Sequence, residues 1–255
     1  MPVANDPIIV SAAGMVSPVG HSAAVTFASV KAGLARIAES PELRIRDDRG
    51  KLMTVTCAAA TGITDGHRRY LRHFRLAVRA LAQTLKNAAV GRLELRRTTL
   101  HLVLAEPSRP GMDHRVEQDL ARKMILALGL EAPLQTIVTT EGHAGIFEAL
   151  ASAMSSIVSG RSDRAIVGAV DGYLDELTLQ WLKDTERPKT DDNPKGFVPG
   201  EAAGFLMLER ESAATARGAR VLATMEGTGY SLEPSSIYDK TPSTGAGLTD
   251  AIRGA

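Results

Sequence analysis

The stretch from residue 135 to 159, QTIVTTEGHAGIFEALASAMSSIVS, most constrains how this chain can fold. It begins with a run rich in β-branched residues, which is typical of a strand, and then turns at Glu141-Gly142-His143. Between residues 144 and 159 the only charged residue is Glu148, and the others are mostly small or apolar. Because a helix that is apolar or small on every face is a buried helix, we predict one enclosed helix at the centre of a layered domain.

The corner before this helix is the first place to look for chemistry. The N-terminus of a helix stabilises negative charge, and many α/β enzymes place a nucleophile there. Here the corner carries Glu141 and His143, but neither a cysteine nor a serine. The sequence therefore argues against a nucleophile at this corner.

Composition excludes several classes of function. Lys and Arg total 30 against 29 Asp and Glu, so the net charge of +1 gives no electrostatic reason to expect nucleic acid or an anionic membrane as a partner. The single cysteine, Cys57, excludes an internal disulfide and suits a reducing compartment. We find neither a signal peptide nor an apolar run of membrane length. We therefore expect a cytoplasmic α/β protein with no cofactor and no metal site.

Strand and helix patterns alternate along the chain, which predicts a mainly parallel sheet covered by helices on both faces. We predict strands at residues 8–13, 53–59, 98–105, 136–140, 164–169, 202–209 and 221–230. We predict helices at residues 23–32, 67–90, 112–130, 144–159 and 175–183, and the opening of another at 245–255. Ser22 is placed to cap the first helix, and residues 185–200 read as a polar loop. No internal repeat or linker divides the sequence, so we expect a single domain over residues 1–255.

Three segments follow patterns that occur together in one family. Residues 7–20, PIIVSAAGMVSPVG, match an opening strand and a G-x-V-S-P-x-G loop. Residues 160–172, GRSDRAIVGAVDG, are similar to G-x-x-D-x-A-ϕ-x-G-G-x-[DE]. Residues 186–231 are similar to R-P-F-D-x-x-x-x-G-F-V-x-G-E-G-A-G-ϕ-ϕ-ϕ-L-E followed by R-G-A-x-ϕ-x-A. In this order and spacing, the chain resembles the β-ketoacyl synthases of the thiolase superfamily.

The resemblance implies a thiolase-like layered α/β/α/β/α architecture, of which this chain holds mainly the N-terminal half. A complete family member has two duplicated halves that pack on one another. This chain ends about where the second half begins, and both a natural half-length form and a truncated one are compatible with that.

The resemblance also implies what is missing. In the family, a cysteine at the N-terminus of the central helix takes the acyl group from an acyl carrier protein. Counting back seventeen positions from Gly160, the family's spacing, reaches His143, so Glu141-Gly142-His143 stands where the family has T-A-C. The two histidines and the lysine that the family uses for decarboxylation and condensation belong to the second half. The nucleophile and the base are therefore both expected to be absent.

The residues that carry the motifs are interpreted as structural. Glycines in the first motif permit a close approach of the backbone at a loop, and two more bracket a glutamate at a turn into a strand. The aspartate of the second motif lies just before a strand and is interpreted as closing its turn. The set is Gly14, Gly20, Gly160, Asp163, Gly200, Glu201 and Gly204.

Other chemistry-bearing residues have ordinary explanations. Cys57 sits in an apolar strand, where a thiol is usually inert. Glu141 and His143 could form an acid–base pair, but two ligands do not make a zinc site, and we favour a structural His143. The basic segment RRYLRHFR, residues 68–75, together with His67 is interpreted as a solvated helix surface. A docking patch for an acidic partner is the alternative.

Two hypotheses of function follow. The first is a non-catalytic ketosynthase-like protein that acts as an interaction or accessory subunit, like a chain-length factor or an effector-associated chaperone. The second is an acyl-carrier-dependent β-ketoacyl synthase-type acyltransferase, or a malonyl decarboxylase, completed by a partner chain.

We expect a homodimer or a complex with a thiolase-like ketosynthase subunit, with an acyl carrier protein or a secreted effector as further candidate partners. The resemblance implies an interface on the strand before the corner, since family members dimerise by pairing strands there. Here that strand has no charge and no proline to guard it as an exposed edge. The interface residues are Gln135, Ile137, Val138 and Thr140.

Overall fold

The structure, a computed structural model, is built on a six-stranded sheet with the strand order β5-β4-β6-β7-β1-β8. It describes residues 6–91, 93–130, 134–190, 193–235, 239 and 241–255. The strands of this sheet are β1 (Ile8–Val16), β4 (Thr98–Val103), β5 (Gln135–Thr139), β6 (Arg164–Gly172), β7 (Glu201–Arg210) and β8 (Ala223–Thr224). A separate two-stranded sheet pairs β2 (Ala38–Arg46) with β3 (Leu52–Cys57).

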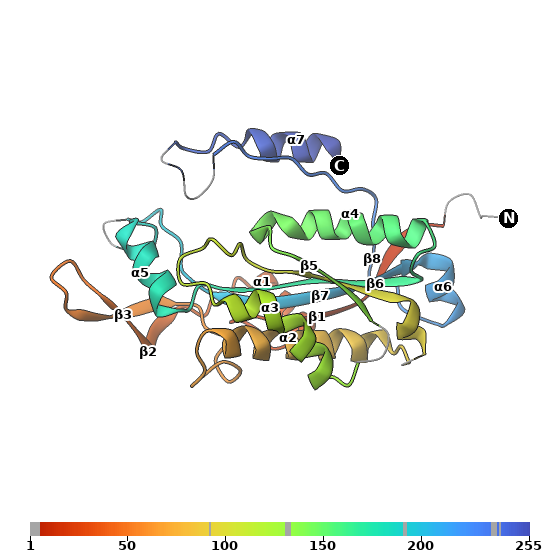
Figure 1. Cartoon of the computed structure of the whole chain (residues 1–255), viewed down its shortest axis with the longest axis horizontal. Helices are drawn as coiled ribbons and strands as arrows, with labels where there is room; N and C mark the ends of the chain where they lie inside the picture. The colour runs from red at the N-terminus through yellow and green to blue at the C-terminus, as the bar shows by residue number, and fades with distance from the viewer. Residues whose placement is uncertain (1–5, 92, 131–133, 191–192, 236–238, 240) are drawn as a thin grey trace.

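Helices cover both faces of the large sheet (Figure 1). On one face lie α2 (Tyr70–Ala88) and α3 (His114–Ala127), and on the other lies α4 (Gly145–Val158). Helix, sheet and helix are the first three layers of the expected α/β/α/β/α order. The shorter helices are α1 (Ala23–Lys31), α5 (Glu176–Asp184), α6 (Glu211–Ala216) and α7 (Ala246–Gly254), with 3-10 turns η1 (Glu94–Arg97) and η2 (Gly142–Ala144). As predicted, Ser22 caps α1 by accepting a hydrogen bond from the Val25 N–H.

The prediction of a mainly parallel sheet is wrong, because the sheet is mixed. β5 and β6 both run parallel to β4, whereas β7 runs antiparallel to its two neighbours β6 and β1, and β8 runs antiparallel to β1. The connections through α3 and α4 return the chain to the end where it started, which produces parallel neighbours. The segment between β6 and β7 does not return it, since Glu201 at the start of β7 pairs with Gly172 at the end of β6.

Three elements differ from the prediction. The strand expected at residues 221–230 is only two residues long, because the chain then leaves the sheet and Gly227 and Gly229 pack on the backbone of the α7 segment. β2 was not predicted, since its sequence AESPELRIR is polar and mostly exposed. The short helix α6 was not predicted either.

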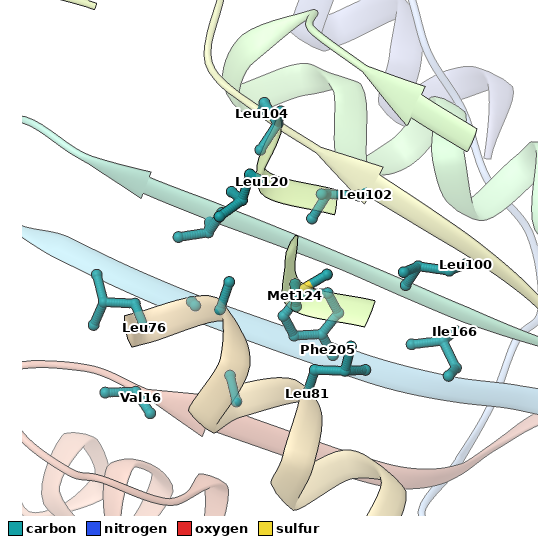
Figure 2. Packing of buried hydrophobic residues seen from close by; sticks show 14 of the residues in the cluster. Val16, Leu76, Leu81, Leu100, Leu102, Leu104, Leu120, Met124, Ile166 and Phe205 are labelled. Atoms are coloured by element: carbon teal, nitrogen blue, oxygen red, sulfur yellow. The ribbon is translucent and has the colours of Figure 1, made fainter. Parts of the chain in front are cut away.

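The main core lies between the sheet and the helices α2 and α3 (Figure 2). Backbone and rings approach each other closely here. A side chain at Gly14 would collide with the Ala80 carbonyl of α2, and one at Gly168 would collide with the Phe205 ring. The close packing of α2 on β1 therefore requires a glycine at residue 14. The larger core side chains are Val16, Leu76, Leu81, Leu100, Leu102, Leu104, Leu120, Met124, Ile166 and Phe205.

The prediction that α4 is enclosed on every side is wrong for the described part of the chain. Ala149, Ala153 and Ile157 are buried against the sheet in a second apolar cluster. On the opposite side, Phe147 is 52% exposed and Val158 is 63% exposed. Composition alone cannot distinguish a helix packed on both sides from one packed on a single side, because small and apolar residues are compatible with either.

A large side chain at the buried face of α4 should destabilise the fold. Ala153 is completely buried, so Ala153→Phe must displace β-strand side chains, and such overpacking costs about 1–3 kcal/mol or more. Ser152→Phe is the matched control, since Ser152 is the adjacent, exposed residue. Urea unfolding should show a lower midpoint for Ala153→Phe and little change for Ser152→Phe. Equal midpoints for both variants would contradict the packing described here.

Candidate functional site

The strand-to-helix corner is held in a conformation that requires Gly142. Its φ is +61°, in the left-handed region, and a Cβ at this residue would lie 2.6 Å from Oε2 of Glu106. The Gly142 N–H donates a hydrogen bond to the Leu104 carbonyl at 3.2 Å, which fixes the corner to the chain just after β4. His143 follows at the surface, immediately before α4, with its side chain 69% exposed.

The imidazole of His143 faces two side chains from the end of β6. Its Nε2 lies 3.2 Å from the Tyr173 hydroxyl, within hydrogen-bond distance, and 3.8 Å from Oδ2 of Asp171. The rings of His143 and Tyr173 are nearly parallel, with 6.1 Å between their centroids. Glu141 is exposed, and within the described ranges no hydrogen bond or ion pair joins it to His143. The two corner residues named from the sequence therefore do not form an acid–base pair.

A buried arginine organises the other side of this cluster. The side chain of Arg109 is 1% exposed, and its guanidinium donates to both carboxylate oxygens of Asp171 at 2.5 and 3.2 Å. It also lies over the Tyr173 ring, with Cζ 4.6 Å from the centroid, while Phe197 contacts that ring edge-on. The corner is thus a cluster of one imidazole, one phenol and one neutralised carboxylate.

Electrostatics fix the charge states of two members of the cluster, Arg109 and Tyr173. Burial lowers the pKa of Arg109, but the hydrogen bond and the charge of Asp171 raise it by more, so the guanidinium stays charged. Burial raises the pKa of the Tyr173 hydroxyl, which therefore stays protonated near neutral pH. Tyr173 is thus a neutral phenol within hydrogen-bond distance of His143 Nε2, and not a phenolate nucleophile.

The chain's single thiol is elsewhere. Cys57 ends β3 in the small two-stranded sheet, and its side chain belongs to the apolar cluster beneath that sheet. Burial raises the pKa of the Cys57 thiol, which disfavours the reactive thiolate. In the described part of the chain, no group of three or more His, Cys, Asp or Glu side chains is arranged to hold a metal ion, and no helix is long and apolar enough to cross a membrane.

Glu201 is a buried motif residue whose carboxylate has several hydrogen-bond partners. Its carboxylate accepts hydrogen bonds from Arg72 of α2 at 2.7 and 2.8 Å, from the Thr64 hydroxyl at 2.5 Å and from the Ala60 N–H at 3.0 Å. The side chains of Arg72 and Glu201 are 6% and 1% exposed. Glu201 therefore does more than shape a turn, because it connects β7 to α2 and to the loop before α2.

The remaining motif residues occupy turns, strands and close contacts. Gly160 has a φ of +73° just after α4, and Gly20 packs against Thr26 of α1. Asp163 lies before β6 and accepts from the Arg97 guanidinium at 2.9 Å. Gly200 forms a bridge with Ala58 just before β7, and Gly204 lies inside that strand.

The interpretation of residues 67–75 as a solvated basic surface is wrong in part. Arg72 is buried on Glu201, and His73 points inwards, where burial lowers its pKa. Arg69 lies 3.6 Å from both Asp113 and Asp175, and Arg68 pairs with Glu176 at 3.2 Å. Internal carboxylates therefore neutralise most of the charge that an acidic partner would need.

The strand chosen as an interface does lie at an edge. Among the described residues, β5 pairs only with β4, and its other side is open. Ile137 is 37% exposed and Val138 is 39% exposed, while Gln135 is exposed and Thr140 is half-buried just after the strand.

Comparison with known proteins fits this geometry. Residues 108–214 match the family model described as the β-ketoacyl synthase, N-terminal domain. Nodulation protein E of Rhizobium meliloti is 36% identical over 124 residues, which are 46% of this chain and 30% of that protein. Part of the chain is therefore similar to the β-ketoacyl synthases. The match nevertheless spans less than a third of that relative's length.

Solved ketosynthases share the fold. The ishigamide ketosynthase/chain length factor superposes with a TM-score of 0.73 at 20% identity, over 98% of this chain and 69% of that one. A type II polyketide synthase ketosynthase, solved in complex with its acyl-carrier protein, superposes with a TM-score of 0.74 at 17% identity, over 98% and 70%. The thiolase-like fold expected from the sequence motifs is confirmed.

Sequence reasoning missed most of the side chains around His143. Asp171 is the acidic position at the end of the second ketosynthase-like motif, so its pattern was visible, but its contact with the corner was not. Tyr173 follows two residues later, and Arg109 and Phe197 come from distant loops. Only the parallel pairing of β4 with β5 and β6 shows that these loops meet at one end of the sheet.

Removing the charge of Glu201 should be strongly destabilising. Glu201→Gln leaves the Arg72 guanidinium buried without its anion, and loss of one partner of a buried pair costs about 3–5 kcal/mol. Glu176→Gln is the control, because its pair with Arg68 is exposed and such pairs contribute less than about 1 kcal/mol. Chemical denaturation monitored by circular dichroism measures both changes. The assignment of Glu201 would be wrong if the two variants lost equal stability.

Proposed function

We propose that this chain is a catalytically inactive ketosynthase-like domain that acts as an interaction subunit. One observation carries the proposal. At the helix N-terminus where the ketosynthase resemblance puts the nucleophilic cysteine, this chain has His143, whose imidazole is within hydrogen-bond distance of the Tyr173 hydroxyl. An imidazole there can exchange hydrogen bonds, but it cannot hold an acyl group as a stable thioester.

The other groups of the corner do not supply the missing nucleophile. Tyr173 is held protonated by burial, and the carboxylate of Asp171 is occupied by Arg109 and by the Gly172 N–H. Cys57 lies in the separate sheet formed by β2 and β3. The groups that remain at the corner are suited to positioning and not to covalent catalysis.

A second candidate function rests on the exposure of His143. Its imidazole is open to solvent and lies next to a phenol, so the pair could hydrogen-bond a thioester carbonyl brought by a partner. Such contacts would suit decarboxylation of a malonyl group, completed by a partner chain. We rank this function below the inactive subunit, because it needs catalytic groups from outside the described residues.

For the partner, we propose a second copy of this chain or a longer thiolase-like ketosynthase subunit, joined through β5. The open edge of β5, with its uncharged residues 135–140, supports strand pairing. The exposed Phe147 and Val158 on the outer side of α4 add apolar surface of the kind that marks a protein contact. One structural neighbour is a ketosynthase/chain length factor, and another is a ketosynthase bound to its acyl-carrier protein. An acyl carrier protein or a secreted effector is a further candidate.

The first prediction is that the protein forms no covalent acyl intermediate. Incubation with an acyl carrier protein that carries a radiolabelled malonyl or longer acyl group should leave the protein unlabelled and should release no carbon dioxide. Cys57→Ser serves as the control for adventitious acylation of the single thiol. A stable adduct on wild-type protein would overturn the inactive assignment. Carbon dioxide release that His143→Ala abolishes would favour the decarboxylase.

The second prediction concerns association. Val138→Lys places a charge on the open edge of β5 and should shift the sedimentation profile towards a smaller species, with an unchanged unfolding midpoint. Ala223→Lys is the matched control, since it places the same charge on β8 at the opposite edge of the sheet. A wild-type protein that sediments as a monomer at micromolar concentration would contradict self-association. Equal effects of the two lysines would contradict the choice of edge.

A further inference from the structure

Helix α1 is oriented with its polar side towards the protein. Its two hydroxyl residues, Thr26 and Ser29, are buried. The Thr26 hydroxyl donates to the Gly20 carbonyl at 3.1 Å, and the Ser29 hydroxyl donates to the Val19 carbonyl at 2.9 Å. A Cβ at Gly20 would lie 2.5 Å from the Thr26 backbone nitrogen, so the helix packs closely on the loop before it. These contacts fix the hydroxyl side of α1 inwards.

The apolar side of α1 faces outwards. Phe27 is 72% exposed and Val30 is 64% exposed, although a surface helix normally turns its apolar side to the core. Three more apolar residues that are at least half exposed extend this surface, one on α1 and two in the segment after it: Val25, Leu34 and Ile37. We call these five residues the α1 surface. Exposed apolar surface of this kind marks a contact with a partner.

A hollow lies beside the α1 surface. Its volume is about 330 Å³, and it is lined by residues 19–22, Val25 and Arg36. Ligand sites measure about 300–1,000 Å³, so this hollow is at the lower end of the range and fits one anchoring side chain better than a cofactor. Side chains that anchor a protein contact fill pockets of this kind.

The charges around the α1 surface are both positive. Between residues 7 and 38 the only charged side chains are Lys31 and Arg36, and both residues are exposed. In the part of the chain that the structure describes, neither side chain forms a hydrogen bond or an ion pair. A partner that is complementary in charge therefore carries carboxylates beside its apolar face.

Strand addition does not suit this surface. The strand before α1, β1, pairs with β7 on one side and with β8 on the other. Beyond β8, side chains of α2 occupy the polar groups of β1, since Gln83 accepts from the Met15 N–H and Asn87 donates to the Ala13 carbonyl. The main-chain hydrogen bonds on which strand addition depends are thus already made. An amphipathic helix binds instead through its apolar side chains.

We propose that the α1 surface binds an amphipathic helix of a partner protein, one whose apolar face is flanked by carboxylates. The apolar face covers Phe27 and its neighbours, one anchoring side chain enters the hollow, and the carboxylates pair with Lys31 and Arg36. An anionic membrane fits less well, because it would repel the exposed Glu39 and Glu42 that follow directly. Since α1 contacts β1, on the side of the sheet away from β5, this surface is separate from the edge in the proposed function.

Two designed helical peptides test the proposal on the whole chain. Each is about 18 residues long, since shorter isolated helices are marginally stable, and each carries leucines on one face. Glutamates flank the leucines in one peptide and lysines flank them in the other. Fluorescence anisotropy should show that wild-type protein prefers the glutamate peptide and that high salt reduces this preference.

Removal of the exposed aromatic side chain should weaken binding. Phe27→Ser should reduce the affinity for the glutamate peptide by about tenfold or more, as truncation of an anchoring aromatic does. Tyr230→Ser is the matched control, since Tyr230 is an aromatic residue with 71% exposure in the C-terminal segment. It should leave the affinity unchanged.

Reversal of the two cations gives an independent readout. Lys31→Glu combined with Arg36→Glu should invert the preference, so that the lysine peptide binds more tightly than the glutamate peptide. The proposal is overturned if neither peptide binds, if both bind wild-type protein equally, or if Tyr230→Ser weakens binding as much as Phe27→Ser. It is also overturned if, without peptide, Phe27→Ser dissociates a wild-type oligomer or releases the protein from phosphatidylglycerol vesicles, because a second copy or a lipid surface would then cover α1.

Discussion

The ion pair between Arg72 and Glu201 is the interaction on which the arrangement of the large sheet and its helices depends. Taking both charges out of water is costly. The cost is offset because both carboxylate oxygens accept hydrogen bonds from the Arg72 guanidinium, and Oε1 also accepts from the Thr64 hydroxyl and the Ala60 N–H. The pair fixes where α2 begins relative to the start of β7. That position in turn sets the contact of α2 with β1 at Gly14 and the core around Phe205.

The sequence predicts the elements that are periodic and well buried, and it fails where long-range pairing decides. The apolar run of β4 and the amphipathic α2 and α3 were located within a few residues, because their patterns reflect burial directly. The mixed strand directions could not be predicted, since a local pattern does not state to which end of the sheet a connection returns. The exposed side of α4 was missed for a related reason, as the composition of a helix does not state how many layers pack on it.

The candidate site shows the same division. His143 was found because motif spacing fixes a position along the chain. The inference that this residue cannot hold a thioester follows from the residue type alone. Arg109, Asp171 and Tyr173 could not be assembled from the sequence, since they converge only after β4, β5 and β6 are side by side. The corner of this ketosynthase-like chain thus surrounds His143 with polar side chains that hydrogen-bond one another.

The burial of Cys57 makes its thiol a probe of local opening in the small sheet. Its side chain packs with Leu43, Val55 and Leu179 beneath the β2–β3 hairpin, in a cluster distinct from the core on the large sheet. The hairpin is tied to α5 by the Gln180 side chain, which accepts from the Arg46 N–H and donates to the Arg46 carbonyl. Lifting the hairpin would expose the thiol while the large sheet stays folded, as local opening requires less free energy than global unfolding. The rate at which a thiol reagent modifies Cys57, the only cysteine in the sequence, would therefore report how often the β2–β3 sheet opens.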